Sequence, residues 1–473
     1  MNFRISICIL VLLCITVGAA CAARINLVDP VRITGDELMK SIYMFPHWWD
    51  PWKSDDAALT ADIQKIKGLG FNTLCLDHEV SQAVDREWYW LDREYKLAGQ
   101  EKVYILPWLQ LQCVDRLGLM QFSHFQLSEA VNQDKQPEAD CANFRDPEFR
   151  RALAHYVEAY LERYINDPAL LNIKDGDKMK PVVGLMVETG WRSTNGLPLS
   201  FDDETNAYFR RWMKSSYHDL AQLNKKWGTS YKSFDEIDPC DKAIFNYDFP
   251  DKANMPKAVQ DHVRFRARMI GEALQEVAKQ VRKRHKNVLF AAEIAYPLSS
   301  DNPDAAAYKW NDANEYKAVE FADMVYIRTV GNTSTGQVKK EQDLMMQNGK
   351  KVILAYRFFG DSTPARAIAF ALDCATSANG IGYYNWNETA DDASAIYNKP
   401  DRQAMAGIML DTYDLLCNPD KRQVTAAVVV PLEAAAPVAA VEPAPAPLPA
   451  LEPVAPVIEP APATTVAPAT PAP

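Results

Sequence analysis

Short, almost uniformly apolar segments alternate with amphipathic ones along most of this chain. The apolar segments are 41–46, 71–76, 103–109, 181–187, 288–295, 323–327, 351–356 and 380–384. The amphipathic stretches 60–69, 147–164, 203–217 and 258–284 predict helices between them. Strands that are apolar on both faces and separated by helices indicate a parallel sheet. Eight such units predict an α/β fold, a (β/α)8 TIM barrel with long loops.

The two ends of the chain do not continue this pattern. Residues 1–23 contain Arg4, then a short apolar run and small residues, which is typical of a secretory signal peptide. Lipid attachment at Cys21 and a retained membrane anchor are the alternatives. From Pro431 to Pro473 there are 13 prolines in 43 residues, which predicts an extended, disordered tail. A docking motif for a partner is the alternative for this segment.

These observations divide the chain into a signal peptide at 1–23, a barrel at 24–422 and a disordered Pro/Ala-rich tail at 423–473. We expect a protein that is secreted or held in the periplasm or cell envelope, with attachment through the tail or Cys21 as a further option. No other apolar run is long enough to predict a membrane span in the mature chain. The formal net charge of −11 argues against nucleic-acid and anionic-lipid partners.

Cysteine and histidine spacing gives no sign of a metal site, and we predict no metal and no cofactor. The cysteines that follow the signal segment are Cys75, Cys113, Cys141, Cys240, Cys374 and Cys417. Cys75 lies inside an apolar run, which favours a buried thiol. Cys113 with Cys141, and Cys374 with Cys417, are the pairs to test for disulfides in an oxidising compartment.

Carboxylates and aromatic residues recur where the predicted strands end, which is where this fold places its chemistry. The residues that we expect to contact a ligand there are His47, Trp48, Trp108, Trp191, Tyr356, Arg357, Trp386 and Glu388. Aromatic rings stack on the apolar faces of sugars, and carboxylates bind hydroxyl groups or perform acid–base chemistry. The partner we expect is therefore an oligosaccharide or polysaccharide. Packing for each tryptophan, a loop cap for His47 and an ion pair between Arg357 and Glu388 are the alternatives.

Several segments resemble glycoside hydrolase family 42, the family of β-galactosidases. The most specific is the helix 208–213 followed by 223–231, which reads "LN-x-x-WGT-x-Y". Segments 43–48, 143–150 and 383–387 resemble the family's first strand, the start of its third helix and its last strand. The resemblance spans 41–415 and implies a (β/α)8 barrel that hydrolyses O-glycosidic bonds. It also implies that Glu188, at the end of the fourth strand, is the general acid/base.

The chain departs from the family pattern at three positions. Val187 stands where the family has an Asn, and His47 stands where the first strand has an acid. Counting back from Gly360 places Tyr356 where the family has its nucleophilic Glu. Because retaining hydrolysis needs two carboxylates, the position of the second one is open.

Three hypotheses follow from the missing carboxylate. The second carboxylate is relocated, to Glu293 or Glu388, or Tyr356 is the nucleophile with Arg357 lowering its pKa, or the barrel binds sugars without catalysis. Glu293 is our candidate because it is the first charged residue after the apolar run 288–292, next to the strand of Glu188. A structural partner for Arg328 or Arg357 is the alternative. We therefore expect an exported glycoside hydrolase, with a catalytically silent carbohydrate-binding protein as the alternative.

Overall fold

The computed structural model describes eleven segments of the chain. They are residues 26–35, 37–46, 55–85, 87–110, 116–186, 199–248, 254–294, 316–330, 342–357, 363–387 and 395–418. All of them belong to one compact unit. The predicted signal peptide and the predicted tail lie outside the described residues.

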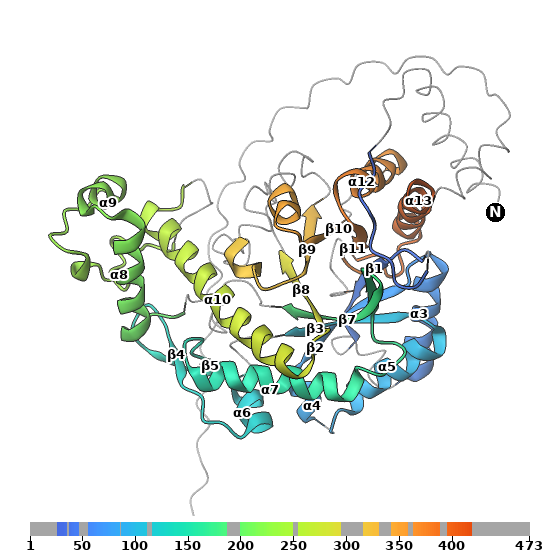
Figure 1. Ribbon diagram of the computed structural model, residues 1–473, viewed down its shortest axis with the longest axis horizontal. Coiled ribbons are helices and arrows are strands. Elements are labelled where there is room, and N and C mark those ends of the chain that lie inside the picture. The colour runs from blue at the N-terminus through green and yellow to red at the C-terminus, as the bar shows by residue number, and fades with distance from the viewer. Residues whose placement is uncertain are drawn as a thin grey trace, which may run out of the picture. The chain divides into compact units, whose positions relative to one another are not determined.

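A closed barrel of parallel strands is the centre of the fold (Figure 1). Its strands are β1 (Lys40–Met44), β2 (Thr73–Glu79), β3 (Tyr104–Gln110), β7 (Lys178–Met186), β8 (Leu289–Ile294), β9 (Met324–Val330), β10 (Lys351–Arg357) and β11 (Gly380–Tyr383). Neighbours along the chain are neighbours in the sheet, and β11 pairs with β1 to close the ring. The predicted (β/α)8 barrel is confirmed, with a strand at each of the predicted positions.

Helices alternate with these strands and surround the barrel (Figure 1). They are α3 (Asp56–Gly68), α4 (Val80–Val84), α5 (Tyr89–Glu101), α6 (Arg116–Ser123), α7 (Pro147–Tyr164), α10 (Lys257–Arg284), α12 (Pro364–Ser377) and α13 (Pro400–Cys417). The sequence fixes the start of α7 clearly, because Asp146 accepts a hydrogen bond from the Glu148 amide and Pro147 occupies the first turn. The helices predicted at 147–164 and 258–284 are confirmed to within one residue.

Smaller elements lengthen the loops of the barrel. β4 (Glu129–Val131) and β5 (Pro137–Ala142) form an antiparallel hairpin, and β6 (Asn172–Asp175) pairs antiparallel with β7. After β7 come α8 (Asp203–Tyr217), α9 (Leu220–Trp227) and the short helix η4 (Phe234–Glu236), and η8 (Tyr316–Val319) precedes β9. The α8–α9 pair extends to one side of the barrel in Figure 1.

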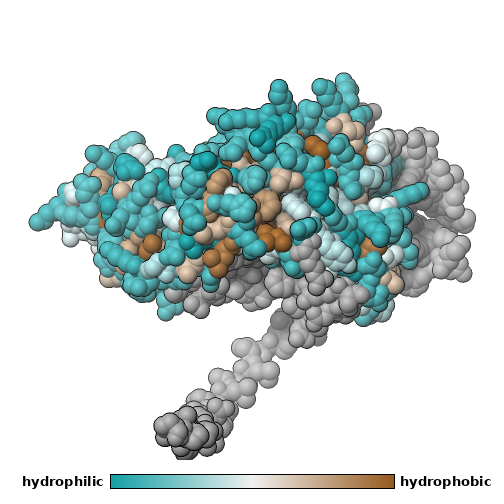
Figure 2. Space-filling model, turned by 90° about the horizontal axis from the view of Figure 1, so that it is seen from below, coloured by the Kyte–Doolittle hydropathy of each residue, from teal (hydrophilic) through white to brown (hydrophobic). Residues whose placement is uncertain are grey.

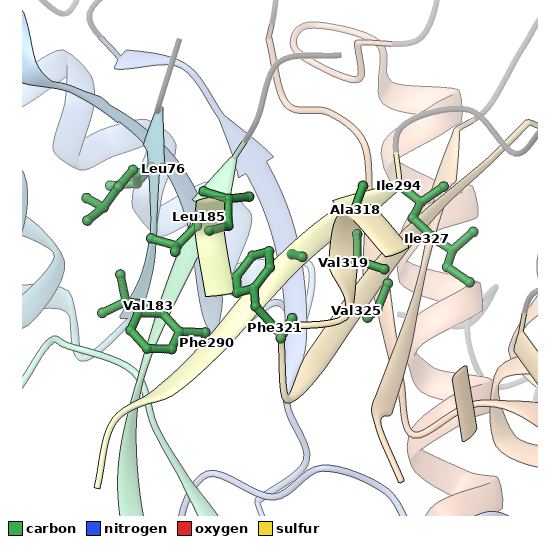
Figure 3. Close-up of a cluster of buried hydrophobic side chains, with 14 of the residues drawn as sticks. Leu76, Val183, Leu185, Phe290, Ile294, Ala318, Val319, Phe321, Val325 and Ile327 are labelled. Carbon is green, nitrogen blue, oxygen red and sulfur yellow. The ribbon is translucent and has the colours of Figure 1, made fainter. Parts of the chain in front are cut away.

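Two layers of buried side chains explain why the strand segments are apolar throughout. One layer fills the barrel interior and includes Tyr43, Trp108 and Tyr326. The other lies between the strands and the helices (Figure 3). Because successive residues of a strand point to opposite faces, each strand supplies both layers and exposes neither face to water.

The surface agrees with a compact barrel. On the face in Figure 2, hydrophilic residues cover most of the coloured area and apolar residues form small groups. Within the described part of the chain, no helix is both long enough and apolar enough to cross a membrane.

The described cysteines form no disulfide with one another. Cys374 on α12 and Cys417 on α13 are buried and unbridged, so the disulfide considered between them is not formed. Cys141 forms no disulfide with another described cysteine, and Cys113 lies outside the described residues. Cys75 is buried as expected, and burial raises the pKa of its thiol to about 12. A thiol that stays protonated at neutral pH packs as a small apolar group.

Candidate active site at the carboxyl end of the barrel

Charged side chains face the barrel interior near the carboxyl ends of three strands. Cys75, Ala291 and Tyr326 belong to the interior layer, and Asp77, Glu293 and Arg328 follow two residues later on the same strands. A strand has a period of two, so these three side chains share the interior face. Most barrels fill such positions with branched aliphatic residues. Buried charge at this level therefore marks the mouth of the barrel as the candidate site.

Glu293 and Arg328 form a two-point ion pair inside the barrel. Arg328 Nε donates to Glu293 Oε1, and Arg328 Nη2 donates to Glu293 Oε2 over 2.8 Å. Only 7% of Glu293 is exposed. Burial lowers the pKa of Arg328, but the Glu293 carboxylate raises it more, and it stays well above its usual value. The guanidinium therefore stays charged at neutral pH, and its two hydrogen bonds to Glu293 fit the alternative of a structural partner for Arg328.

Two tyrosine rings hold the Arg328 guanidinium from the sides. Its central carbon lies 3.8 Å from the ring centroid of Tyr384 and 5.3 Å from that of Tyr43. Contacts of this kind between a cation and an aromatic ring contribute about 0.5–2 kcal/mol, more when the cation is desolvated. The position of Glu293 thus depends on an arginine that is itself held on several sides.

Trp108, a predicted sugar contact, packs inside the barrel and is fully buried. Its ring stacks on Tyr43 with centroids 6.0 Å apart and meets the edge of Tyr326 at 5.2 Å. The register places Trp108 opposite Gly184, where a Cβ atom would lie 2.2 Å from the indole. Gly184 therefore makes the room in which Trp108 lies, and a direct sugar contact for Trp108 stays a prediction.

Tyr356 and Trp386 lie in the outer layer, between the barrel and its helices. The neighbours Ile353 and Ala355 take the interior positions of β10, so Tyr356 points outward and packs against Phe370 of α12 at 4.4 Å. Trp386 is fully buried and meets the edge of Tyr397. This orientation favours packing over sugar contact for both residues and speaks against Tyr356 as a nucleophile, and their sugar contacts stay predictions.

The remaining predicted site residues are not described at side-chain level. Glu188, His47, Trp48, Trp191 and Glu388 lie outside the described residues. Arg357 ends β10, but its side chain is also outside the described part. The catalytic role of Glu188 accordingly stays a prediction.

Asp77, Tyr43 and Tyr384 are not among the site residues predicted from the sequence. All three have interior positions at the mouth, and Asp77 is 2% exposed. The signal that reveals Asp77 is the two-residue alternation of β2, counted from Cys75. The position of Tyr384 beside Arg328, two strands away in the sheet, has no comparable signal in the sequence.

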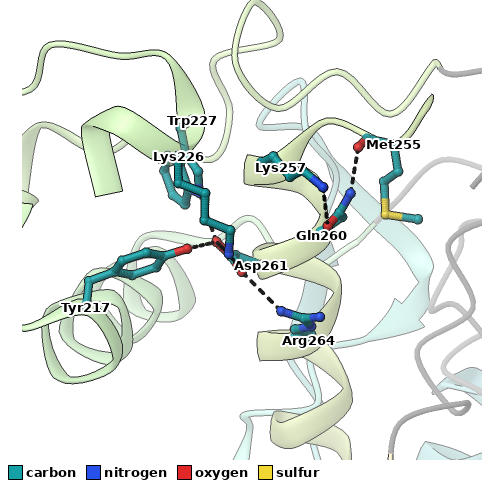
Figure 4. A network of polar contacts seen from close by, with 8 residues as sticks. All are labelled: Tyr217, Lys226, Trp227, Met255, Lys257, Gln260, Asp261 and Arg264. Atoms are coloured by element: carbon teal, nitrogen blue, oxygen red, sulfur yellow. Dashed lines mark hydrogen bonds and ion pairs between the residues drawn. The ribbon is translucent and has the colours of Figure 1, made fainter. Parts of the chain in front are cut away.

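The motif that resembles family 42 most closely builds the scaffold. Asn224 accepts hydrogen bonds from Thr229 and from the Tyr231 amide, which closes the loop after α9. Trp227 and Lys226 donate to the buried carboxylate of Asp261 on α10, and Tyr217 donates to the same group (Figure 4). The motif therefore fixes the α8–α9 pair to α10.

His262 belongs to the same region and is a packing residue. It bonds to the Tyr247 hydroxyl and lies among the rings of Phe201, Phe209 and Phe265. Burial, and after it the charge of Arg266, hold the pKa of His262 well below its usual value, so the ring is neutral at pH 7. Among the described residues, no group of three or more His, Cys, Asp or Glu side chains could hold a metal ion.

Comparisons with known proteins agree with this fold. The family model of glycoside hydrolase family 42, described as β-galactosidase, matches residues 127–354. The curated β-galactosidase Bga of Halorubrum lacusprofundi is 25% identical over 217 residues, which are 41% of this chain and 27% of that protein. The chain thus matches about a quarter of the length of this relative.

Solved structures with the same fold include glycosidases of two kinds. The β-galactosidase of Halorubrum lacusprofundi has a TM-score of 0.53 at 17% identity, and the superposition covers 80% of this chain and 58% of that protein's chain. The cold-adapted β-galactosidase of Rahnella sp. R3 has a TM-score of 0.54 at 14% identity, with coverage of 82% and 58%. The catalytic domain of a β-amylase from Paenibacillus polymyxa has a TM-score of 0.55 at 11% identity, with coverage of 79% and 98%. Together with the match at 127–354, these likenesses support a barrel similar to that of glycoside hydrolase family 42.

Proposed function

We propose that this protein binds a glycan at the carboxyl end of the barrel and hydrolyses an O-glycosidic bond there. The observation that carries the proposal is the buried, interior-facing charge of Asp77, Glu293 and Arg328 at the mouth of a family 42-type barrel. Burying charge costs several kcal/mol per ion, and pairing offsets this cost only in part, so charged residues in place of aliphatic ones call for a functional reason. β-Galactosides are the first substrates to test, because the similar proteins are β-galactosidases.

Glu188 is the proposed general acid. Val182 is an interior residue of β7, and Gly184 lies against the interior Trp108. Glu188 continues this two-residue series in the sequence, two residues after β7 ends at Met186. The last pair in the β7–β8 register is Gly184 with Ala291. Extended by two residues, this register places Met186 level with Glu293. This proximity in the sheet, together with the motif match, supports Glu188 as the central residue of the site.

Catalytically silent sugar binding is the second candidate function. The observation that favours it is the ion pair that occupies both oxygens of Glu293, the carboxylate we expected to act together with Glu188. Hydrolysis needs a carboxylate that can exchange a proton or attack the sugar. A carboxylate held at both oxygens by an arginine is poorly suited to either step.

A hydrolysis screen with Glu188→Gln separates the two functions. We expect the wild type to release product from at least one member of a panel of aryl glycosides and polysaccharides. Glu188→Gln should reduce that rate about 100-fold or more, because a positioned general acid contributes at least this much. Glu162→Gln, on an exposed part of α7, is the control and should keep the full rate.

Two outcomes would contradict parts of the proposal. A wild-type rate that survives in Glu188→Gln shows that Glu188 is not the acid. Sugar binding measured by calorimetry without hydrolysis of any panel member establishes the silent barrel instead.

We also propose that the protein is exported. The support is the composition of residues 1–23 and of the Pro-rich segment 431–473. Mass spectrometry of the protein recovered from the culture medium or cell envelope should find an N-terminus close to residue 23. A mass increase on Cys21 indicates lipid attachment, and an intact Met1 on cytoplasmic protein rules export out.

A further inference from the structure

We propose that Arg328 contacts the substrate, donating hydrogen bonds from the free edge of its guanidinium to two adjacent oxygens of the bound sugar. Vicinal hydroxyls of a neutral sugar and the carboxylate of a uronic acid are the two sources of such an oxygen pair. The inference rests on the proposed function, because it requires that the mouth binds a glycan. It adds a residue that the family resemblance does not supply, and it gives Arg328 a role besides its pairing with Glu293.

The neighbours of Arg328 on β9 show that its side chain enters the mouth of the barrel. Met324 and Tyr326 lie in the interior layer, and Val325 and Ile327 lie in the outer layer. Arg328 continues this alternation on the interior side, two residues before the end of β9. Because the barrel strands are parallel, this is the carboxyl end of the barrel, where the proposed site lies.

The guanidinium of Arg328 uses only one of its edges within the described part of the protein. Nε and Nη2 donate to the two oxygens of Glu293, and no other described residue accepts a hydrogen bond from Arg328. An arginine side chain has five N–H groups, so three remain. One of these on Nη1 and one on Nη2 point the same way from the end of the guanidinium and form a second fork, which fits a pair of adjacent oxygens.

Arg328 is the accessible member of its group. Its side chain is 12% exposed, whereas that of Glu293 is 4% exposed. Tyr384 and Tyr43, over whose rings the guanidinium lies, are 2% and 1% exposed. The buried polar atoms without a partner include the Tyr43 hydroxyl but not Arg328 Nη1, although Nη1 has no acceptor among the described residues. The free edge of the guanidinium is therefore open to a ligand.

The contacts of Arg328 fix the guanidinium before a ligand arrives. Its two hydrogen bonds to Glu293 set the direction of one edge, and the ring of Tyr384, centred 3.8 Å from the central carbon, restricts movement on one side. A planar fork that is already oriented loses less conformational entropy for each hydrogen bond it forms. The pairing with Glu293 thus prepares the opposite edge for binding.

Arg328 lies close enough to the strand of the proposed general acid to act on the same sugar. In the sheet, β8 alone lies between β9 and β7, the strand that precedes Glu188. Neighbouring strands are about 4.8 Å apart, which places β9 about 10 Å from β7. One sugar ring with a hydrogen-bonded group on each side spans such an interval. Arg328 can therefore hold the sugar on which Glu188 is proposed to act.

Calorimetric titration with deoxy sugars tests the contact. Galactose, glucose and mannose are titrated first, and the tightest binder is then compared with its monodeoxy analogues and its uronate, on the wild type and on Arg328→Lys. Lysine keeps a charge beside Glu293 but lacks the planar fork. The control is Arg282→Lys. Arg282 also pairs with a carboxylate, that of Asp323, and lies over the ring of Phe290, but at the amino ends of β8 and β9.

We expect that removing either of two adjacent hydroxyls weakens binding to the wild type at least about tenfold, the usual worth of a hydrogen bond from a charged donor. Arg328→Lys should bind the parent sugar about tenfold less tightly, and the same two deoxy analogues should then lose little more, because the contact is already gone. A uronate that binds the wild type more tightly than the neutral sugar, and loses this advantage in Arg328→Lys, identifies the carboxylate as the oxygen pair. Arg282→Lys should reproduce the wild-type pattern.

The outcomes separate this inference from the function on which it rests. A wild type that binds none of the sugars, neutral or acidic, overturns both. If Arg328→Lys binds the parent sugar and its analogues as the wild type does, or if Arg282→Lys weakens them equally, the role of Arg328 alone is overturned. Should Arg328→Lys fail to fold, the wild-type profile decides, and a profile in which neither an adjacent pair of hydroxyls nor the carboxylate matters refutes the inference.

Discussion

Glu293→Gln is expected to lower the free energy of unfolding by about 3–5 kcal/mol, the usual cost of breaking a buried ion pair from one side. The substitution leaves the Arg328 guanidinium charged inside the barrel and replaces the carboxylate by a neutral amide, whose NH2 group cannot accept a hydrogen bond from it. Arg328 lies over the rings of Tyr384 and Tyr43, and these rings cannot replace a carboxylate. Urea denaturation followed by intrinsic fluorescence measures the loss directly.

A double-mutant cycle distinguishes a structural from a catalytic Glu293. Arg328→Met removes the charge and keeps much of the side-chain volume, so the double variant should lose clearly less stability than the sum of the two single variants. If the stability losses of the two single variants simply add up in the double variant, the ion pair contributes nothing to folding. A Glu293→Gln variant that is as stable as the wild type but loses activity by orders of magnitude restores Glu293 as the second catalytic carboxylate.

The barrel was predictable because its signal is local and repeated. Each strand is apolar on both faces, and each helix has its own amphipathic pattern, so no distant contact was needed to find them. The extent of β2 shows where this approach fails. Its apolar run stops at Leu76, yet the strand continues to Glu79, because His78 finds buried partners on α5 and α7. Those partners are far away in the sequence.

The candidate site was harder to predict for the same reason. A strand-end aromatic is visible in the sequence, but whether it faces the interior depends on register, and Tyr356 proves to face outward against Phe370. The acidic residue Asp77 was visible too, but only the fold shows that the strand of Arg328 lies on the opposite wall of the barrel. Glu293 was found from its sequence position, and only the fold shows that Arg328 holds it.

The family motif illustrates a related limit. It is the most family-specific segment of the chain, yet its described residues serve the docking of α9 on α10 through Asp261. A sequence pattern records that residues depend on one another. It does not record whether they depend on one another for folding or for catalysis, and that distinction requires the contacts.

Gly271→Ala is expected to destabilise the fold by about 3 kcal/mol, although alanine is the better helix former. In an open helix, replacing glycine by alanine gains up to about 1 kcal/mol. Gly271, however, lies where α10 crosses η8, and a Cβ atom there would be 1.8 Å from the carbonyl oxygen of Lys317. The obstacle is backbone, so α10 or η8 must move, and overpacking of this kind outweighs the gain in helix propensity.

Gly68→Ala is the matched control, because Gly68 is also helical, in α3, and has nothing within 4 Å of its Cβ position. Its melting temperature should equal or exceed that of the wild type, because the propensity gain has no steric cost to oppose it. The two variants change the same atoms in the same type of element, so their difference in unfolding free energy isolates the α10–η8 contact. Equal stability of the two variants would show that this crossing is looser than the geometry indicates, and that the wall carrying β8 and β9, with Glu293 and Arg328, can shift.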